Sequence, residues 1–286
     1  MVAGLLEPDW NLTGWPPTTA TSRVEARPNG LLAALPAREH DRLAPHLESI
    51  NLRLGETLYE PGQLQKWVYF PAGAVISKLY VMNSGATGAI ALAGIEGVVG
   101  FSLYMGGSTA PTRAAVQVAG AAHRIKGDVL RREFDGDGIL RQLLLRYTEA
   151  LLVQIGQTAV CNRHHTIDQQ LCRWLLMILD RLPSDQMVMT QELIARMLGV
   201  RREGVTEAAG HLQRAGVIRY SRGHIKVIDR ERMEALSCEC YASVRHELAR
   251  LLPWCDYAGC EHDQPGRAQT NSSGVATRHR RSGASL

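Results

Sequence analysis

The chain has 286 residues, which is enough for two modest domains and their connecting segments. A hydrophobic content of 45% is ordinary for a folded protein and excludes wholesale disorder. The formal net charge of +4 is only mildly basic, so it permits nucleic-acid binding without indicating it. Six cysteines in a chain of this length do not make a disulfide scaffold, and we expect reduced thiols.

We predict tails over residues 1–28 and 254–286, because both segments are rich in turn-forming and polar residues and show no periodicity. Between them we predict a β-rich domain over 29–134, a long helix over 135–163 and a mainly helical domain over 164–253. Charged residues interrupt the longest apolar stretches, and the first residues lack the pattern of a signal peptide. We therefore expect a cytoplasmic protein with no membrane span.

The N-terminal domain is predicted to be a β-sandwich or roll that follows a short helical stretch over Leu31–Leu47. From Ile50 to Ile125, short apolar runs alternate with glycines, and helical periodicity is absent. The clearest strand patterns are Val68–Phe70, Ala74–Tyr80 and Ala114–Val118, which carry β-branched and aromatic residues.

Helical periodicity returns over Ile139–Cys161, where a seam recurs at alternating four- and three-residue steps. The seam is apolar in its first half and polar in its second. Its apolar members are Leu140, Leu144, Tyr147 and Leu151. We interpret these four residues as the interface of a homodimer. The alternative is a helix that packs on its own domain.

A further helix is predicted to begin near Thr166. Thr166 and Gln169 have the spacing of a capping box, in which each side chain binds a backbone N–H at the start of the helix. Apolar residues over Leu171–Leu179 give this helix one buried face, and Pro183 ends the segment.

The strongest pattern in the chain is a predicted helix-turn-helix. Thr190–Leu198 has the pattern of a short amphipathic helix, Gly199 breaks it, and Arg201–Ala215 forms a second helix. Two helices that cross over a tight turn need a small residue where they approach, which Ala195 provides, and Gly199 tolerates the positive φ of the turn. The alternative is a helical hairpin that has no contact with DNA.

The exposed face of the second predicted helix favours DNA binding. It opens with Arg201, Arg202 and Glu203, and its next exposed turn carries Thr206 and Glu207. In the major groove, arginine can form two hydrogen bonds to guanine, and glutamate can accept one from cytosine. The N-terminus of a helix also favours a nearby phosphate.

A basic β-hairpin is predicted directly after this helix. Val217–Tyr220 and His224–Ile228 are strand patterns, and Ser221–Gly223 is a turn. We interpret the hairpin as a wing that contacts backbone phosphates. The complete set of predicted DNA-contacting residues is Thr190, Gln191, Arg201, Arg202, Glu203, Thr206, Arg219, Arg222, His224 and Lys226.

A Gly-rich β-roll, a long helix and a winged helix-turn-helix, in this order, resemble the Crp/Fnr family of bacterial transcription regulators. The matching segments are Glu96–Gly100, Thr190–Glu203 and Gly216–Ile228, and the resemblance covers about Leu31–Leu252. It implies an α+β fold with an N-terminal β-roll like a cyclic-nucleotide-binding domain, a long dimerisation helix and a C-terminal winged helix-turn-helix.

The resemblance also implies partners and residue roles. A homodimer would bind double-stranded DNA at a two-fold symmetric operator in a promoter, with half-sites in successive major grooves. Arg202 and Glu203 would contact bases and Arg201 would contact phosphate. Several family members carry a second basic reader where this chain has Glu207, so the operator sequence stays open. RNA polymerase is a candidate partner, and a membrane is not.

The predicted sensor departs from relatives that bind cyclic nucleotides. Those relatives use a Gly-Glu pair, whose glutamate holds the ribose, and an Arg-Ser or Arg-Thr pair, whose arginine meets the cyclic phosphate. Here Phe101 and Ser102 follow Gly100, and no serine or threonine follows Arg113. The effector is therefore unidentified, and the roll could equally be a fixed scaffold without one. If there is an effector, we expect it to change how the long helices pack and so to reorient the recognition helices.

We expect no cofactor and no metal. Relatives with an iron–sulfur cluster carry most of its cysteines in an N-terminal run, and this chain has no cysteine before Cys161. The remaining candidates are Cys238, Cys240, Cys255 and Cys260 for a metal or redox site, and His164 or His165 for haem. Cys-x-Cys is not the usual spacing of a zinc site, so we expect cysteines that only pack. Paired histidines at a helix hinge are more often capping or solvent-exposed.

We expect no enzymatic activity. The sequence has no phosphate-binding loop, no Gly-x-Ser-x-Gly elbow and no His-Glu-x-x-His pattern. A different alternative is an effector-binding β-roll protein whose helix-turn-helix docks another protein. The salt dependence of DNA binding distinguishes it from a regulator, because phosphate contacts release counterions.

The first testable prediction is that the chain does not bind cyclic AMP tightly. Without the carboxylate after Gly100, a buried ribose hydroxyl lacks its partner, which costs roughly 1–3 kcal/mol. Isothermal titration calorimetry measures this affinity directly. A dissociation constant in the micromolar range or below would contradict the prediction.

Overall fold

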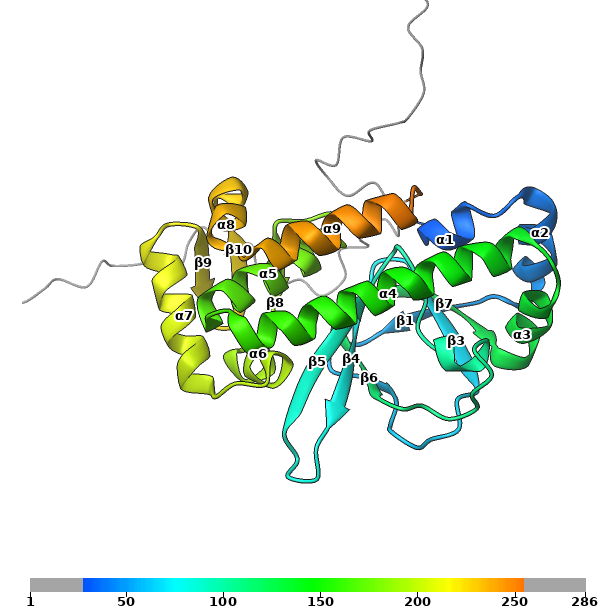
Figure 1. Cartoon of the computed structure of the whole chain (residues 1–286), viewed down its shortest axis with the longest axis horizontal. Helices are drawn as coiled ribbons and strands as arrows, with labels where there is room; N and C mark the ends of the chain where they lie inside the picture. Colours follow the sequence, from blue (N-terminus) through cyan, green and yellow to red (C-terminus); the bar gives the residue numbers. More distant parts are fainter. Residues whose placement is uncertain (1–27, 255–286) are drawn as a thin grey trace, which may run out of the picture.

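One long helix, α4 (Ile139–His164), connects a β-rich half of the molecule to a mainly helical half (Figure 1). The computed structural model describes residues 28–254. Apart from their innermost residues, both predicted tails lie outside this range, as do Cys255 and Cys260. Between residues 28 and 254, no helix combines the length and the apolar character needed to span a bilayer.

The N-terminal helical stretch is broken, where the sequence predicted one helix. It consists of α1 (Gly30–Ala33), α2 (Ala37–Leu43) and the 3-10 turn η2 (Ala44–His46). Pro36 is the reason, because a proline disfavours helical geometry in the residue before it and fits the start of a new helix. Pro36 is the N-cap of α2.

The β-rich half is a roll of two antiparallel sheets, as predicted. The strand orders are β1-β7-β3 and β2-β6-β4-β5. The three predicted strand segments fall in β3, β4 and β6. The roll contains β1 (Glu48–Leu52), β2 (Thr57–Tyr59), β3 (Trp67–Pro71), β4 (Val75–Val81), β5 (Thr87–Ala93), η3 (Phe101–Leu103), β6 (Arg113–Val118) and β7 (Gly120–Lys126), and α3 (Gly127–Asp135) follows it.

The long helix is confirmed, but its predicted dimer seam faces inward. The exposed fractions of Leu140, Leu144, Tyr147 and Leu151 are 1%, 0%, 2% and 3% within the single chain, so they offer a partner no surface. Leu140, Leu144 and Tyr147 belong to the main hydrophobic core, which includes residues of the roll, and Gln154 continues the seam by accepting a hydrogen bond from the backbone N–H of Leu92 at 2.6 Å. The assignment to a dimer interface was therefore wrong. Over three heptads, spacing alone does not tell which neighbour covers a stripe.

The helical half contains a helix-turn-helix with its wing, together with additional elements. The capping box at Thr166 is present, and it starts α5. The elements are α5 (Ile167–Leu179), β8 (Gln186–Val188), α6 (Gln191–Leu198), α7 (Arg202–Arg214), β9 (Ile218–Ser221), β10 (His224–Val227), α8 (Arg230–Leu236) and α9 (Glu239–Leu251).

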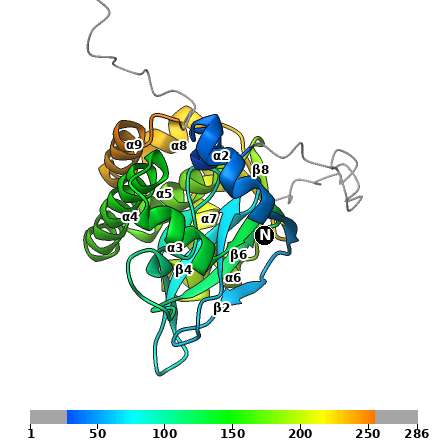
Figure 2. The same cartoon turned by 90° about the vertical axis from the view of Figure 1, so that its right-hand side faces the viewer.

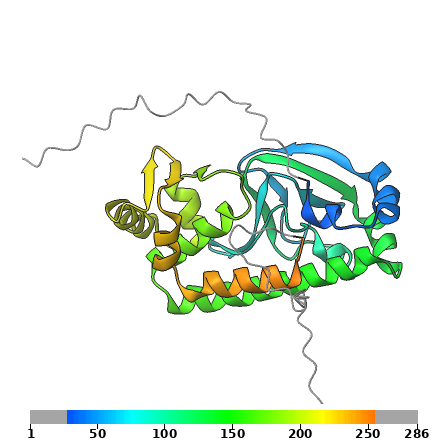
Figure 3. The ribbon, with the colours of Figure 1, turned by 90° about the horizontal axis from the view of Figure 1, so that it is seen from above.

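The last helix folds back along the connecting helix. α9 lies antiparallel beside α4, and the two form a layer on one side of the sheets (Figures 2 and 3). Arg250 of α9 approaches Glu149 of α4 at 3.5 Å near one end of this contact. The C-terminal segment therefore contacts the helix that leads into the helical half, which the sequence did not indicate.

A buried ion pair joins the two halves directly. Arg181, which follows α5, lies 2.8 Å from the carboxylate of Glu96 in the roll, and their side chains are only 1% and 2% exposed. The same carboxylate accepts the N–H of Gly94 at 3.1 Å. Next to it, Gly97 packs against Tyr147 of α4 so closely that a Cβ there would lie 1.8 Å from the ring. The segment Glu96–Gly97 is thus the point where the roll, α4 and the end of α5 meet.

We predict that Glu96→Gln destabilises the chain by about 3–5 kcal/mol, because it removes the carboxylate charge that lies 2.8 Å from the buried Arg181 guanidinium. Chemical denaturation followed by circular dichroism measures the free energy of unfolding. The matched control is Glu48→Gln, which removes a partly exposed pair with Arg124 and should cost about 0–1 kcal/mol. Equal losses from the two variants would contradict the prediction.

Candidate nucleic-acid interface

The helix-turn-helix has the local geometry that its sequence predicted. Thr190 is the N-cap of α6, and its hydroxyl accepts the N–H of Leu193 at 3.2 Å. Gly199 ends α6 with a φ of 69°, a left-handed conformation that costs other residues about 1–2 kcal/mol. The N–H of Val200 then bonds to the carbonyl of Ala195 at 3.1 Å. These contacts fix the turn before α7 begins.

The inner faces of α6 and α7 form a small core with α5. The small residue expected at the crossing, Ala195, is 5% exposed. The predicted core residues Ile194, Leu198, Val205, Ala208 and Leu212 are buried, and Val200 is partly buried. On the surface next to this core, His211 of α7 pairs with Asp168 of α5 at 2.8 Å. Both packing and this hydrogen bond therefore hold α7 in place.

The opposite face of α7 is exposed to solvent at its start. Arg201, Arg202 and Glu203 are all exposed, and Glu207 is exposed one turn later. Arg201 is the N-cap residue, but its side chain makes no capping hydrogen bond. The first N–H groups of α7 and the positive end of its dipole thus point outward together with two guanidinium groups. This arrangement can bind a phosphate and present side chains to base edges.

Thr190, Gln191 and Thr206 are bonded within the protein. Thr190 caps α6, as described above. The hydroxyl of Thr206 donates to the side-chain oxygen of Gln191 at 2.9 Å and also lies 3.1 Å from the carbonyl of Arg202. Gln191 is only partly exposed. The structure thus brings these predicted residues together where the start of α6 meets α7, and their hydrogen bonds stabilise the contact between the two helices.

The predicted wing is present and includes a third strand. β9 and β10 are joined by Arg222 and Gly223, whose φ values of 48° and 82° match the two positive values of a type I′ turn. β8 pairs with the other side of β10, and the sequence did not predict this strand because it is short.

Tyr220 anchors the wing, and the sequence analysis missed this role. Its hydroxyl donates to the carbonyl of Met189 at 2.9 Å, and its N–H donates to Gln213 of α7 at 2.7 Å. Partial burial raises the pKa of Tyr220 to about 12, so the hydroxyl stays a donor over the physiological range. The wing is therefore fixed relative to the recognition helix.

The basic side chains of the wing differ in their exposure to solvent. Arg219 and Arg222 are exposed, and Arg222 lies at the tip. His224 is partly buried, and Lys226 lies 3.5 Å from Asp185. Arg219 and Arg222 are thus the wing residues best placed for phosphate.

The roll touches the helix-turn-helix through the hairpin between β4 and β5. The hydroxyl of Thr87 donates to the carbonyl of Arg196 in α6 at 3.0 Å. A groove opens between the two halves beside this contact. Its charged lining residues are Arg113 of the roll and Glu192, Arg196, Arg201 and Arg202 of the helix-turn-helix. Basic residues outnumber acidic ones in this groove, which favours anions.

In the roll, Arg113 and Lys78 both contact other side chains. Arg113 forms an ion pair with Glu60 at 2.8 Å. Lys78, only 3% exposed, has its ammonium 3.5 Å from the ring centre of Phe101. Burial lowers the pKa of Lys78 to about 7. The sequence did not single out Lys78, because a lysine in a strand is ordinarily exposed.

Comparison with known proteins places these features in a family. Residues 169–236 match the model of the Crp-like helix-turn-helix domain, which spans from α5 to α8. FixK2 from Bradyrhizobium japonicum superposes with a TM-score of 0.56 at 16% identity, over 67% of this chain and 98% of its own. No curated protein matches the chain significantly in sequence.

Two further solved structures have the same fold. The c-di-GMP-responsive global regulator CLP from Xanthomonas campestris has a TM-score of 0.56 at 14% identity, over 68% of this chain and 100% of its own. A CRP/FNR-family transcriptional regulator from Thermus thermophilus has a TM-score of 0.55 at 18% identity, over 66% of this chain and 98% of its own. This chain carries a Crp-like helix-turn-helix domain within the fold of the Crp/Fnr transcription regulators.

Proposed function

We propose that the protein is a cytoplasmic, sequence-specific DNA-binding regulator that binds a two-fold symmetric operator as a homodimer and is not an enzyme. The observation that carries the proposal is the start of α7. There, two exposed arginines and a glutamate surround an uncapped helix N-terminus, beside a wing whose tip is Arg222. A helix of this kind fits the major groove, and a hairpin beside it reaches the flanking phosphates.

The side chains divide into base readers and phosphate contacts. Arg202 and Glu203 lie in the first turn of α7 and reach base edges when that end enters the groove. Arg201, one residue earlier, lies beside the helix N-terminus and contacts the backbone, as Arg219 and Arg222 do from the wing. The phosphate contacts set affinity and register, and the base contacts set sequence preference.

The dimer in this proposal uses a face of α4 other than the predicted seam. Leu145 and Leu152 are 44% and 63% exposed, and they lie two turns apart on one face. Gly156 continues that face, and a Cβ there would meet no atom within 4 Å. An exposed glycine inside a helix costs about 1 kcal/mol relative to alanine. Close approach of a second α4 offsets this cost and covers both leucines.

We also propose that the signal sensed by the roll is not cyclic AMP. The family's phosphate-binding arginine corresponds to Arg113, which is paired with Glu60. A cyclic phosphate would have to break that pair, and the ribose would find no carboxylate after Gly100. Both effects oppose binding.

We predict that the double variant R201E/R202E weakens operator binding at least about 100-fold, because two phosphate- or base-contacting cations become anions. The operator is obtained by selection from genomic DNA with the unmodified protein, and fluorescence anisotropy measures the affinity. The matched control is R131E/R132E, an equal charge reversal at two adjacent exposed arginines of α3.

The control variant should bind with nearly unchanged affinity at moderate salt.

In the unmodified protein, the logarithm of the affinity should fall linearly with the logarithm of salt concentration. Arg201→Ala should reduce that slope by about 1. Selection that enriches no symmetric sequence, or operator occupancy that survives R201E/R202E in a folded protein, would refute the proposal.

We predict that Leu152→Glu weakens the dimer at least about tenfold, because it places two carboxylates in an apolar helix contact. Sedimentation equilibrium measures the dimer dissociation constant. Leu64→Glu is the matched control, since Leu64 is also 63% exposed but lies in a loop of the roll. If both variants remain dimeric, the exposed face of α4 is not the interface.

A further inference from the structure

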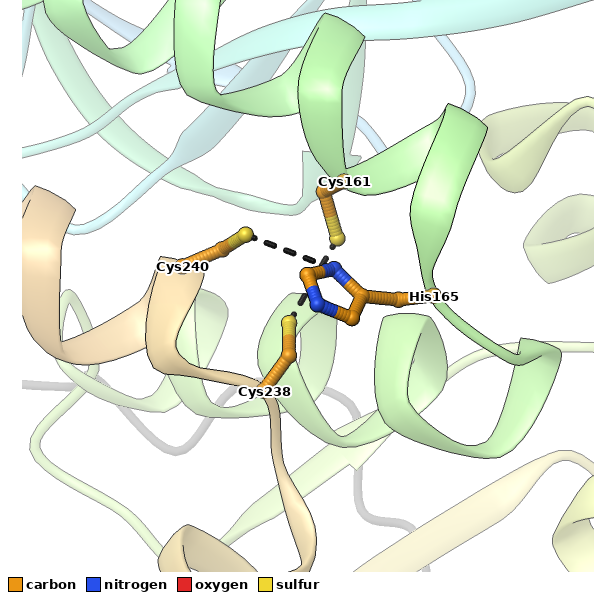
Figure 4. Close-up of side chains that lie close together, drawn as sticks. All are labelled: Cys161, His165, Cys238 and Cys240. Atoms are coloured by element: carbon orange, nitrogen blue, oxygen red, sulfur yellow. Dashed lines mark hydrogen bonds between the residues drawn. The ribbon is translucent and has the colours of Figure 1, made fainter.

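Three cysteines and a histidine converge where the helical half joins α4 (Figure 4). Cys161 lies in the last turn of α4, and His165 is the C-cap residue that leads into α5. Cys238 is the N-cap of α9, and Cys240 lies in the first turn of α9. Nothing in the sequence indicates that α9 returns to the end of α4, so Cys238 and Cys240 could not be connected with Cys161 and His165 from the sequence alone.

The four side chains have the dimensions of a metal site. The Sγ atoms of Cys161 and Cys238 are 3.5 Å apart, and Sγ of Cys240 is 3.5 Å from Nδ1 of His165. All four potential ligand atoms lie within 4.8 Å of one another. Zinc–sulfur bonds of about 2.3 Å at tetrahedral angles place ligand sulfurs about 3.8 Å apart. Four side chains from two separate segments therefore already lie at distances compatible with one tetrahedral shell.

Simple hydrophobic packing does not account for this arrangement. Cys161, Cys238 and Cys240 are 0%, 3% and 0% exposed, and they form a buried cluster with one another, separate from the two hydrophobic cores of the described chain. Cys172 is the contrast, because it is equally buried but packs in the main core with aliphatic neighbours. Three thiols that face one another and a histidine nitrogen are chemically matched to a soft metal ion.

Polar neighbours orient the histidine and one thiol as they do around bound metals. Nε2 of His165 lies 3.3 Å from the carboxylate of Glu239, which favours the tautomer that leaves Nδ1 free to bind a metal. The side-chain amide of Gln157 donates to Sγ of Cys240 at 3.0 Å, and a hydrogen bond of this kind stabilises a thiolate. Both contacts hold their ligand atoms toward the centre of the cluster.

We propose that Cys161, His165, Cys238 and Cys240 bind one zinc ion through three sulfur atoms and one nitrogen atom. Four protein ligands complete a tetrahedral shell, so the site is structural and leaves no position for a substrate. It joins the end of α4, the start of α5 and the start of α9, and it thereby fixes the hinge between the connecting helix and the helix-turn-helix. The site does not depend on the proposed function, since its ligands lie outside α6, α7 and the wing.

The metal content of the purified full-length chain tests this proposal. We expect about one zinc per chain by plasma mass spectrometry, and a reduced apo-protein that takes up cobalt(II) with sulfur-to-metal charge-transfer bands and the intense visible bands of tetrahedral cobalt. Removal of zinc by a chelator should lower the melting temperature, because metal binding stabilises the folded state. These measurements need no variant and no DNA.

Matched substitutions then identify the ligands. Cys161→Ser and Cys240→Ser should lower bound zinc to below about one-tenth per chain at limiting metal, whereas Cys172→Ser should retain it. His165→Gln should weaken binding, whereas His164→Gln, at the exposed neighbouring histidine, should not. Circular dichroism checks that each variant is folded, and the cobalt spectrum of the unmodified protein provides a readout if one is not.

Three outcomes would overturn the assignment. They are an apo-protein that gives no tetrahedral cobalt spectrum under reducing conditions, iron in place of zinc in the protein as purified, and equal metal retention in the cysteine variants and the Cys172→Ser control. A disulfide between Cys161 and Cys238 in freshly purified protein, detected by mass spectrometry with thiol labelling, would also overturn it, because it removes two of the ligands.

Discussion

The placement of the helix-turn-helix relative to the roll depends on one buried ion pair. Arg181 and Glu96 are almost completely removed from water, so separation of the two halves would break a buried attraction between their charges. The pair lies beside the point where Gly97 admits the ring of Tyr147. The roll, α4 and the end of α5 therefore share one constraint, and a movement of one of them has to be accommodated by the others.

Three faces of the long helix have three different surroundings. One face completes the core of the roll through residues such as Leu144, and another supports α9. The remaining face carries Leu145 and Leu152 in water. Because these faces belong to one helix, a change in how α4 packs on the roll would also move the face that carries Leu145 and Leu152 and the end of the helix at His165. This is the physical basis on which a signal in the roll could change the orientation of α7.

Hydrogen bonds connect α6, α7 and the wing to one another, whereas the start of α7 is exposed to solvent. Internal hydrogen bonds at Thr190, Gln191 and Tyr220 hold α6, α7 and the wing together. The start of α7 lacks such a bond, so its N–H groups and arginines are available to a polyanion. The groove between Arg113 and Arg202 brings this surface next to the roll. A change in the β4–β5 hairpin would therefore alter the surroundings of the start of α7.

The sequence by itself determined the local structures: the capping box at Thr166, the turn at Gly199, the hairpin at Gly223 and the exposed arginines of α7. These depend on neighbours a few residues away, so composition and spacing specify them. Only the tertiary structure decided which neighbour covers each face of α4, and that decision overturned the predicted dimer seam. It also decided that Cys238, 77 positions from Cys161, returns to it. Such contacts depend on how whole elements pack, and periodicity within one element carries no information about the element that will lie against it.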